Sequence, residues 1–282
     1  MLKSIALSND ASKYLQVSLD EEILIIKMNR PEKLNGWTLP MMNAIKEALG
    51  IAASSDSVRV IILTGSGKYY SAGVDLGGSL KLMHPKKLRD SIVDFNQQLF
   101  DTFIEFPKPI LVAVNGPAIG ASVTSATLCD GIVASENATF STPFAKLGVP
   151  PEGCSSVQFP KLMGNKCAER MLGNEGWKPN AVEALECGLV QWQVTEQALM
   201  DSATSIARTW VKENKERTFL TDTNIKQLKE INAKESIALA DAFLSAAFFK
   251  NQTEFFWKKK KYLPALVFFL VRALRPIWGR ML

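Results

Sequence analysis

Histidine is almost absent from this sequence of 282 residues, because His84 is the only one. Its four cysteines, Cys129, Cys154, Cys167 and Cys187, form no Cys-x-x-Cys pair. The sequence therefore argues against a zinc site of the usual Cys and His type, and against a triad with a histidine base other than His84. Thiols scattered singly in a long chain are typical of reduced, buried cysteines in an intracellular protein.

Long hydrophobic runs are also missing. No stretch reaches 18 uninterrupted apolar residues, so we expect no ordinary membrane span. The first ten residues lack the apolar run of a secretory signal and are poor in arginine for a transit peptide. With 47% hydrophobic and 22% charged residues, the composition indicates a globular protein with a sizeable core.

Acidic residues are absent from the last 25 positions. That stretch, 258–282, contains Lys258, Lys259, Lys260, Lys261, Arg272, Arg275 and Arg280. The total charge is +5, so these seven cations leave residues 1–257 with a net charge of −2. With no nucleic-acid motif in the body, we predict no nucleic-acid partner.

The apolar stretch 262–271 is too short to span a bilayer, and its basic flanks suggest weak membrane-surface contact. There are two alternatives for this stretch: it is a helix packed on a neighbouring subunit of an oligomer, or it is an extension that arises from an unusual gene model.

The hydropathy pattern predicts an α/β fold. Short runs rich in β-branched residues at 22–28, 58–63, 109–114 and 131–135 predict strands, and apolar residues at helical spacing predict helices at 41–52 and 88–103. This alternation favours parallel pairing of buried strands. Beyond residue 160 the strand signals nearly vanish, and 198–213 and 223–256 are predicted to be amphipathic helices. We therefore divide the chain into a core at 1–197, a helical region at 198–257 and a tail at 258–282.

Two glycine-containing turns follow predicted strands. One spans Asn115 to Ala121 before a helix-like run at 122–128, and the other spans Tyr70 to Leu76. Turns of this kind leave backbone N–H groups unpaired. If the two turns converge, their N–H groups could bind the oxygen of a thioester carbonyl as negative charge develops on it. The alternative is that both are tight turns without a ligand.

A third segment, Leu147 to Ser156, places Glu152 in an apolar loop stiffened by proline and glycine. Desolvation there would raise the pKa of the carboxyl toward that of a useful base. The alternatives are that Glu152 caps the following helix or is simply exposed. The nearest rival carboxylate, Glu136, lies in a polar turn where we expect it to be solvated.

These three segments, together with Asn29 to Asn35, resemble the crotonase superfamily, the enoyl-CoA hydratase/isomerase fold, over residues 15 to 257. Thr142 to Phe144 and Pro151 to Ser156 look most like the peroxisomal Δ3,Δ2-enoyl-CoA isomerases. The resemblance implies a ββα spiral core, a C-terminal helical trimerisation region, a homotrimer or hexamer, and an acyl-CoA thioester substrate. It also implies a peroxisomal location, although the final tripeptide is not the usual signal; mitochondrial or membrane-associated locations are alternatives.

The resemblance also assigns roles to residues. It implies oxyanion N–H donors at Val74 and Ala121, and Glu152 as the sole catalytic acid and base. The substrate-binding residues that it implies are Ala72, Gly73, Val74, Asp75, Leu76, Gly120 and Ala121. The two glutamates of the family's hydratases fall on Thr124 and Phe144, which cannot activate water. We therefore expect an isomerase that converts 3-enoyl-CoA to 2-trans-enoyl-CoA in the β-oxidation of unsaturated fatty acids.

The resemblance leaves two alternatives to an isomerase. One is a non-catalytic acyl-CoA-binding relative, like the crotonase-like domain of chromodomain Y-like proteins, which carries aspartate at the position of the base. The other is an enoyl-CoA hydratase, which the loss of both glutamates disfavours. No metal and no cofactor is implied, since coenzyme A is part of the substrate.

Overall fold

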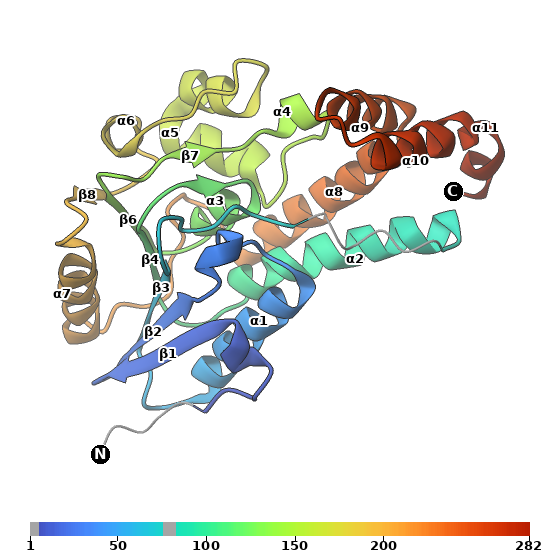
Figure 1. Cartoon of the computed structure of the whole chain (residues 1–282). Helices are drawn as coiled ribbons and strands as arrows, with labels where there is room; N and C mark the ends of the chain where they lie inside the picture. The colour runs from blue at the N-terminus through green and yellow to red at the C-terminus, as the bar shows by residue number, and fades with distance from the viewer. Residues whose placement is uncertain (1–5, 76–82) are drawn as a thin grey trace.

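A computed structural model describes residues 6–75 and 83–282 and has a six-stranded sheet at its centre (Figure 1). In spatial order the strands are β1 (Leu15–Asp20), β2 (Ile23–Met28), β3 (Val60–Gly65), β4 (Ile110–Val114), β6 (Gly131–Ser135) and β8 (Trp192–Val194). The pairs from β2 to β8 are parallel, as the buried apolar runs predict. The first pair is antiparallel, because a two-residue turn at Glu21–Glu22 joins β1 to β2. Strands β1 and β8 were not predicted from the sequence.

Helices cover both faces of the sheet, which explains why the central strands are apolar on both sides. On one face, α7 (Leu199–Lys212) packs Ala203, Ala207 and Trp210 against Ile62 and Leu111 of the strands. The main core lies on the other face, against α1 (Leu39–Ser54), α2 (Pro85–Ile104) and α3 (Ala121–Ala126). A second, two-stranded sheet of β5 (Ala118–Ile119) and β7 (Phe140–Ser141) leads into and out of the region around α3.

The remaining helices follow β7. They are α4 (Phe144–Leu147), α5 (Ser155–Leu172), α6 (Ala181–Glu186), α8 (Ile225–Phe243), α9 (Ala246–Lys258), α10 (Tyr262–Ala273) and α11 (Arg275–Trp278). The range 223–256, predicted to be amphipathic helices, contains two, because the chain breaks at Leu244 and Ser245 caps α9. Helix α8 lies along α2 (Figure 1), where Asn232 donates to Asp101 and Arg89 pairs with Asp241 at 2.6 Å. The division at residues 197 and 257 stays a prediction.

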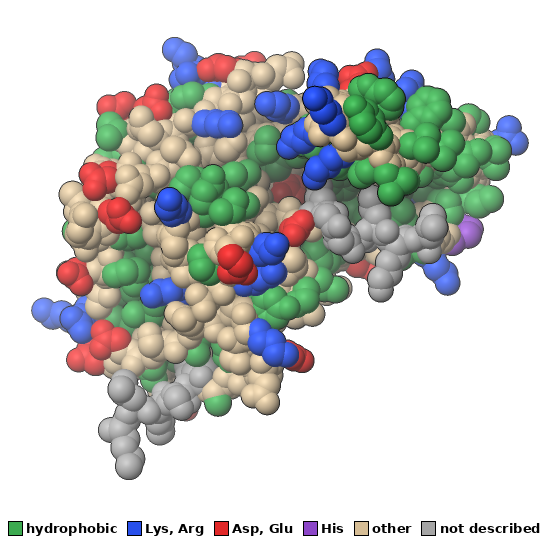
Figure 2. Space-filling view, viewed as in Figure 1, with side chains coloured by type: hydrophobic (Ala, Val, Ile, Leu, Met, Phe, Trp, Pro, Cys, Tyr) green, Lys and Arg blue, Asp and Glu red, His purple; other side chains and the backbone are tan. Residues whose placement is uncertain are grey.

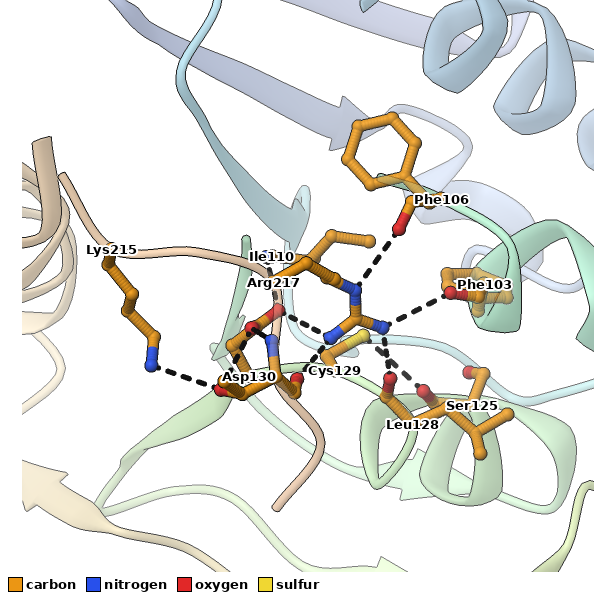
Figure 3. Close-up of polar contacts among 10 residues, drawn as sticks. Phe103, Phe106, Ile110, Ser125, Leu128, Cys129, Asp130, Lys215 and Arg217 are labelled. Carbon is orange, nitrogen blue, oxygen red and sulfur yellow. Dashed lines mark hydrogen bonds and ion pairs between the residues drawn. The ribbon is translucent and has the colours of Figure 1, made fainter. Parts of the chain in front are cut away.

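A buried ion pair fixes the link between α7 and α8 to the core (Figure 3). The guanidinium of Arg217 lies 2.6 Å from the carboxylate of Asp130 and also donates to the carbonyls of Phe103, Phe106 and Leu128. The side chain of Asp130 is fully buried, and burial raises its pKa against the opposing charge of Arg217. Because these carbonyls end α2 and follow α3, Arg217 holds in place the two helices that flank the candidate site.

The last helices carry an exposed apolar surface. Figure 2 shows hydrophobic side chains gathered over α9 to α11, with Lys and Arg side chains beside them. Among the described residues, no single helix is long and apolar enough to cross a membrane. The segments Tyr262–Ala273 and Arg275–Met281 meet the length and composition criteria only as a pair, which is bent by 47°.

Candidate active site

The two glycine-containing turns lie against each other. Ser71 pairs with Ala118 in an isolated parallel bridge, and Ile119 donates its backbone N–H to the carbonyl of Ser71 over 3.0 Å. Gly73 has a φ of +76°, and a Cβ on it would lie 2.3 Å from the carbonyl oxygen of Ile119 and 3.6 Å from the backbone nitrogen of Ala121. Only glycine fits this contact. The segments 71–75 and 118–121 therefore converge, which meets the condition that the sequence left open.

Within the segments 71–75 and 118–121, two backbone N–H groups have no acceptor among the described residues. Gly73 donates to Ser71 Oγ, Asp75 to the carbonyl of Trp37, Ala72 to that of Leu34, and Gly120 to that of Ser141. Within the described part of the chain, the N–H groups of Val74 and Ala121 donate no hydrogen bond. Ala121 is the first residue of α3, where an N–H has no partner inside the helix. The two unused donors are the two that the family resemblance selects, and their role as an oxyanion hole stays a prediction.

The other predicted binding residues are placed as follows. Ala72 and Gly120 are half-buried and Asp75 is exposed, with its backbone N–H bonded to Trp37. Gly120 has a φ of +60°, which lets the chain turn from β5 into α3. The prediction for Leu76 falls outside the described residues.

The loop that carries Glu152 packs against the same helix. Gly153 has a φ of +63°, and a Cβ on it would lie 2.7 Å from Thr124 Oγ1 in α3 and 2.4 Å from the ring of Phe100 in α2. The next residue after Glu152 is thus in contact with α3 one turn after Ala121. Glu152 itself is only 8% exposed. Burial, with the negative charge of Glu235 as a second cause, raises the pKa of its carboxyl to about 8.

Glu235 is a functional candidate that was not predicted from the sequence. This residue of α8 is buried, and its carboxylate accepts hydrogen bonds from the backbone N–H groups of Cys154 at 2.6 Å and Ser156 at 3.0 Å. It therefore holds the loop immediately after Glu152, where Cys154 adopts a φ of +64°. A signal for it exists, because Glu235 lies on the buried stripe of α8 with Leu228 and Leu239, at helical spacing.

The alternative acid and base positions are unsuited to proton transfer. Thr124 is fully buried and its hydroxyl donates to the carbonyl of Ala121, while Phe144 lies in the apolar cluster of α4, α8 and α9. Glu136 is exposed and accepts a hydrogen bond from the N–H of Glu196. Of the four positions considered, only Glu152 offers a buried carboxyl.

No metal centre is indicated in the described ranges, where no group of three or more His, Cys, Asp and Glu residues could hold an ion. The buried Cys129 and Cys154 are free thiols, and burial raises the pKa of Cys129 to about 12 and that of Cys154 further. Neither thiol is therefore suited to act as a nucleophile near neutral pH.

Comparisons with known proteins identify relatives of the whole core. The family described as "Enoyl-CoA hydratase/isomerase" matches residues 18–261. The rat protein "Enoyl-CoA delta isomerase 2" is 40% identical over 205 residues, which cover 71% of this chain and 51% of the relative. The mouse protein "Enoyl-CoA delta isomerase 3, peroxisomal" is 33% identical over 259 residues, or 89% and 80% of the two chains. The rat "Chromodomain Y-like protein" is 33% identical over 242 residues, or 83% and 41%.

Solved structures agree with these sequence relatives. The crystal structure of an enoyl-CoA hydratase/isomerase from Pseudoalteromonas atlantica is 28% identical, with a TM-score of 0.71 over 87% of this chain and 97% of that one. The predicted crotonase-type fold with a C-terminal helical region is thereby confirmed. The chain spans about half the length of the rat isomerase that it matches. The family match over most of the sequence, together with the shared fold, shows that the chain belongs to the enoyl-CoA hydratase/isomerase family.

Proposed function

We propose that the chain is a Δ3,Δ2-enoyl-CoA isomerase. One observation carries the proposal. Two backbone N–H donors without acceptors, those of Val74 and Ala121, occur together with one buried carboxyl, that of Glu152, whose loop packs against helix α3. The naming of two relatives as enoyl-CoA delta isomerases supports it. The absence of ionisable side chains at positions 124 and 144 favours isomerisation over the addition of water.

The proposed reaction is a proton transfer through one group. The ionised Glu152 takes a proton from carbon 2 of a 3-enoyl-CoA, and the electron pair of that C–H bond shifts into a dienolate. Its negative charge lies on the thioester oxygen, where the N–H groups of Val74 and Ala121 stabilise it. The protonated Glu152 then returns the proton to carbon 4, which leaves the double bond between carbons 2 and 3. No cofactor is consumed, and coenzyme A remains part of the substrate.

The assembly and location proposed with this activity follow from the family resemblance. We expect a homotrimer or hexamer in the peroxisome, a location that the name of the mouse relative supports. The acyl-CoA thioester is the substrate, and neither a metal nor a nucleic acid takes part.

Turnover separates the isomerase from a non-catalytic acyl-CoA-binding protein. Purified protein is expected to convert a 3-enoyl-CoA into the conjugated 2-trans thioester, which ultraviolet absorbance follows directly. Isothermal titration with a saturated acyl-CoA measures binding in parallel. Protein that binds the saturated thioester but leaves 3-enoyl-CoA unchanged would overturn the enzymatic proposal. The alternative would then be a non-catalytic acyl-CoA-binding protein, the interpretation that the similarity to the chromodomain Y-like protein favours.

The raised pKa of Glu152 predicts the pH dependence of the reaction. Only the ionised carboxylate can accept the first proton, so kcat/KM should rise about tenfold per pH unit and level off above pH 8. Glu235 contributes to that value by charge repulsion, while burial raises its own pKa and the hydrogen bonds from Ser156 and Cys154 oppose that rise. In the variant Glu235→Gln, the rise of kcat/KM with pH should therefore level off roughly one pH unit lower than in the wild type.

The direction of this shift distinguishes an electrostatic role of Glu235 from a purely structural one. If Glu235 only holds the loop at Cys154 and Ser156, its loss would lower kcat but leave unchanged the pH at which kcat/KM is half its maximum. Asp241→Asn is a matched control, since Asp241 lies on the same helix but is half exposed and pairs with Arg89. If kcat/KM of Glu235→Gln still levels off near pH 8, charge repulsion between Glu235 and Glu152 does not raise the pKa of Glu152.

A further inference from the structure

The tail, residues 258–282, docks on the body through one face only. On the inner side Ala265 is buried, Phe268 stacks on Phe256 with ring centroids 5.5 Å apart, and Trp278 meets Phe249 at 5.8 Å. Trp278 also donates its indole N–H to the carbonyl of Val271. These contacts give α10 a fixed orientation on α9.

The outer side of the tail is apolar and open. Leu263 is 75% exposed and Ile277 is 64% exposed, although side chains of this kind are normally buried. The other large apolar side chains of the tail that are exposed are Tyr262, Leu266, Val267, Phe269, Leu270, Leu274, Met281 and Leu282. Trp257, at the end of α9, is 62% exposed and packs edge-on against Tyr262. The result is one continuous apolar surface over α10 and α11, visible in Figure 2.

Cations border this surface at both ends. Lys258 to Lys261 precede α10 and are all exposed. At the C-terminal end of the surface, Arg272 lies in the last turn of α10 and Arg280 follows α11, and both are exposed. None of these six forms an ion pair in the described part of the chain. The tail contains no acidic residue that could neutralise them.

We propose that the tail surface binds the interface of an anionic phospholipid bilayer. An anionic lipid surface is complementary both to the cations, which its negative potential attracts, and to the apolar face between them. Trp257 and Tyr262 have the amphipathic rings that are enriched at the headgroup level. A second copy of this chain is a poorer match, because a symmetric contact would bring the unpaired cations of both copies together.

The geometry indicates that the tail lies in the interface and does not span it. With 12 residues, α10 is about 18 Å long, whereas the hydrocarbon core of a bilayer is about 30 Å thick. The bend of 47° between α10 and α11 keeps the two segments from forming one straight rod. The inner contacts with α9 leave only the outer side free for insertion, so the body would rest on the membrane surface.

Vesicle flotation of the full-length protein tests the proposal. Wild-type protein should float with vesicles of phosphatidylcholine and phosphatidylserine, less with phosphatidylcholine alone, and less as salt is raised. Changing Lys258, Lys259, Lys260 and Lys261 to Gln should weaken binding at least about tenfold. The triple variant Leu263→Ser, Leu266→Ser and Ile277→Ser should weaken it by a similar factor.

Control variants use exposed residues of the same kinds on other elements. Changing Lys33, Lys46, Lys166 and Lys226 to Gln removes the same charge from the body, and Val182→Ser, Ile225→Ser and Ile237→Ser removes exposed apolar groups. Neither set should alter flotation. Wild-type protein that does not float, or binding that the control sets reduce as much as the tail variants, would overturn the proposal. So would a triple tail variant that dissociates an oligomer in analytical ultracentrifugation while wild-type protein ignores vesicles, which would identify a second copy as the occupant.

Discussion

The variant Glu152→Gln should lose isomerase activity by about 1,000-fold or more in kcat. A single positioned acid or base typically contributes 10²- to 10⁴-fold, and here the same carboxyl is proposed to perform both proton transfers. The amide is nearly isosteric and neutral, as the carboxyl is below pH 8, so packing against α2 and α3 should survive. Initial rates with a 3-enoyl-CoA, together with the dissociation constant of a saturated acyl-CoA, separate loss of chemistry from loss of binding.

Two further measurements keep this result from being read as misfolding. Glu136→Gln removes an exposed carboxylate from the same half of the protein and should leave kcat unchanged. The pKa of Glu152 in the folded protein lies above its ordinary value of 4.5, so the stability that this group contributes is present below pH 4.5 and is lost as pH rises through about 8. Glu152→Gln should therefore melt no lower than wild type at pH 9. A variant that keeps a tenth or more of the wild-type kcat would rule out Glu152 as the base.

The sequence predicts the central strands and the two turns because both depend on local signals. β-Branched runs bounded by turn residues indicate β2, β3, β4 and β6, and glycines after strands mark the loops at Gly73 and Gly120. The hairpin strand β1 was missed although its sequence carries the signal, since apolar and polar residues alternate strictly from Leu15 to Asp20. In the fold, β1 pairs with β2 over six residues, so one face of the hairpin is buried and the other is partly exposed.

The environment of the proposed base could be predicted only in part. Proline and glycine around Glu152 indicate a desolvated loop, and its burial agrees with that expectation. Glu235 lies 83 positions further along the chain, and its contact with the loop exists only because α8 packs along α2. Asn232 and Asp101 form one of the bonds that set this packing. No local pattern reports such a long-range contact, although a glutamate on the buried stripe of a helix is a signal that a partner must exist.

Replacing Ala121 with proline should lower kcat about 100- to 1,000-fold without loss of the fold. The substitution removes one of the two N–H groups proposed to stabilise the dienolate, and loss of one such donor typically costs this much. Proline is tolerated at the first position of a helix, where the N–H has no intrahelical partner, and Ala121 is that position of α3. Helix α2 already begins with Pro85.

The matched control for this variant is Ala121→Gly, which keeps the N–H and removes only a methyl group, so its kcat should stay within about tenfold of wild type. Because ground-state binding depends little on a donor whose interaction strengthens as charge develops, the dissociation constant of a saturated acyl-CoA should change far less than kcat in Ala121→Pro. Equal rates for the proline and glycine variants, measured on folded protein with unchanged far-ultraviolet circular dichroism, would mean that the Ala121 N–H does not stabilise the dienolate. The donor pair would then reduce to Val74 alone, which is fewer than an oxyanion hole of two N–H groups requires.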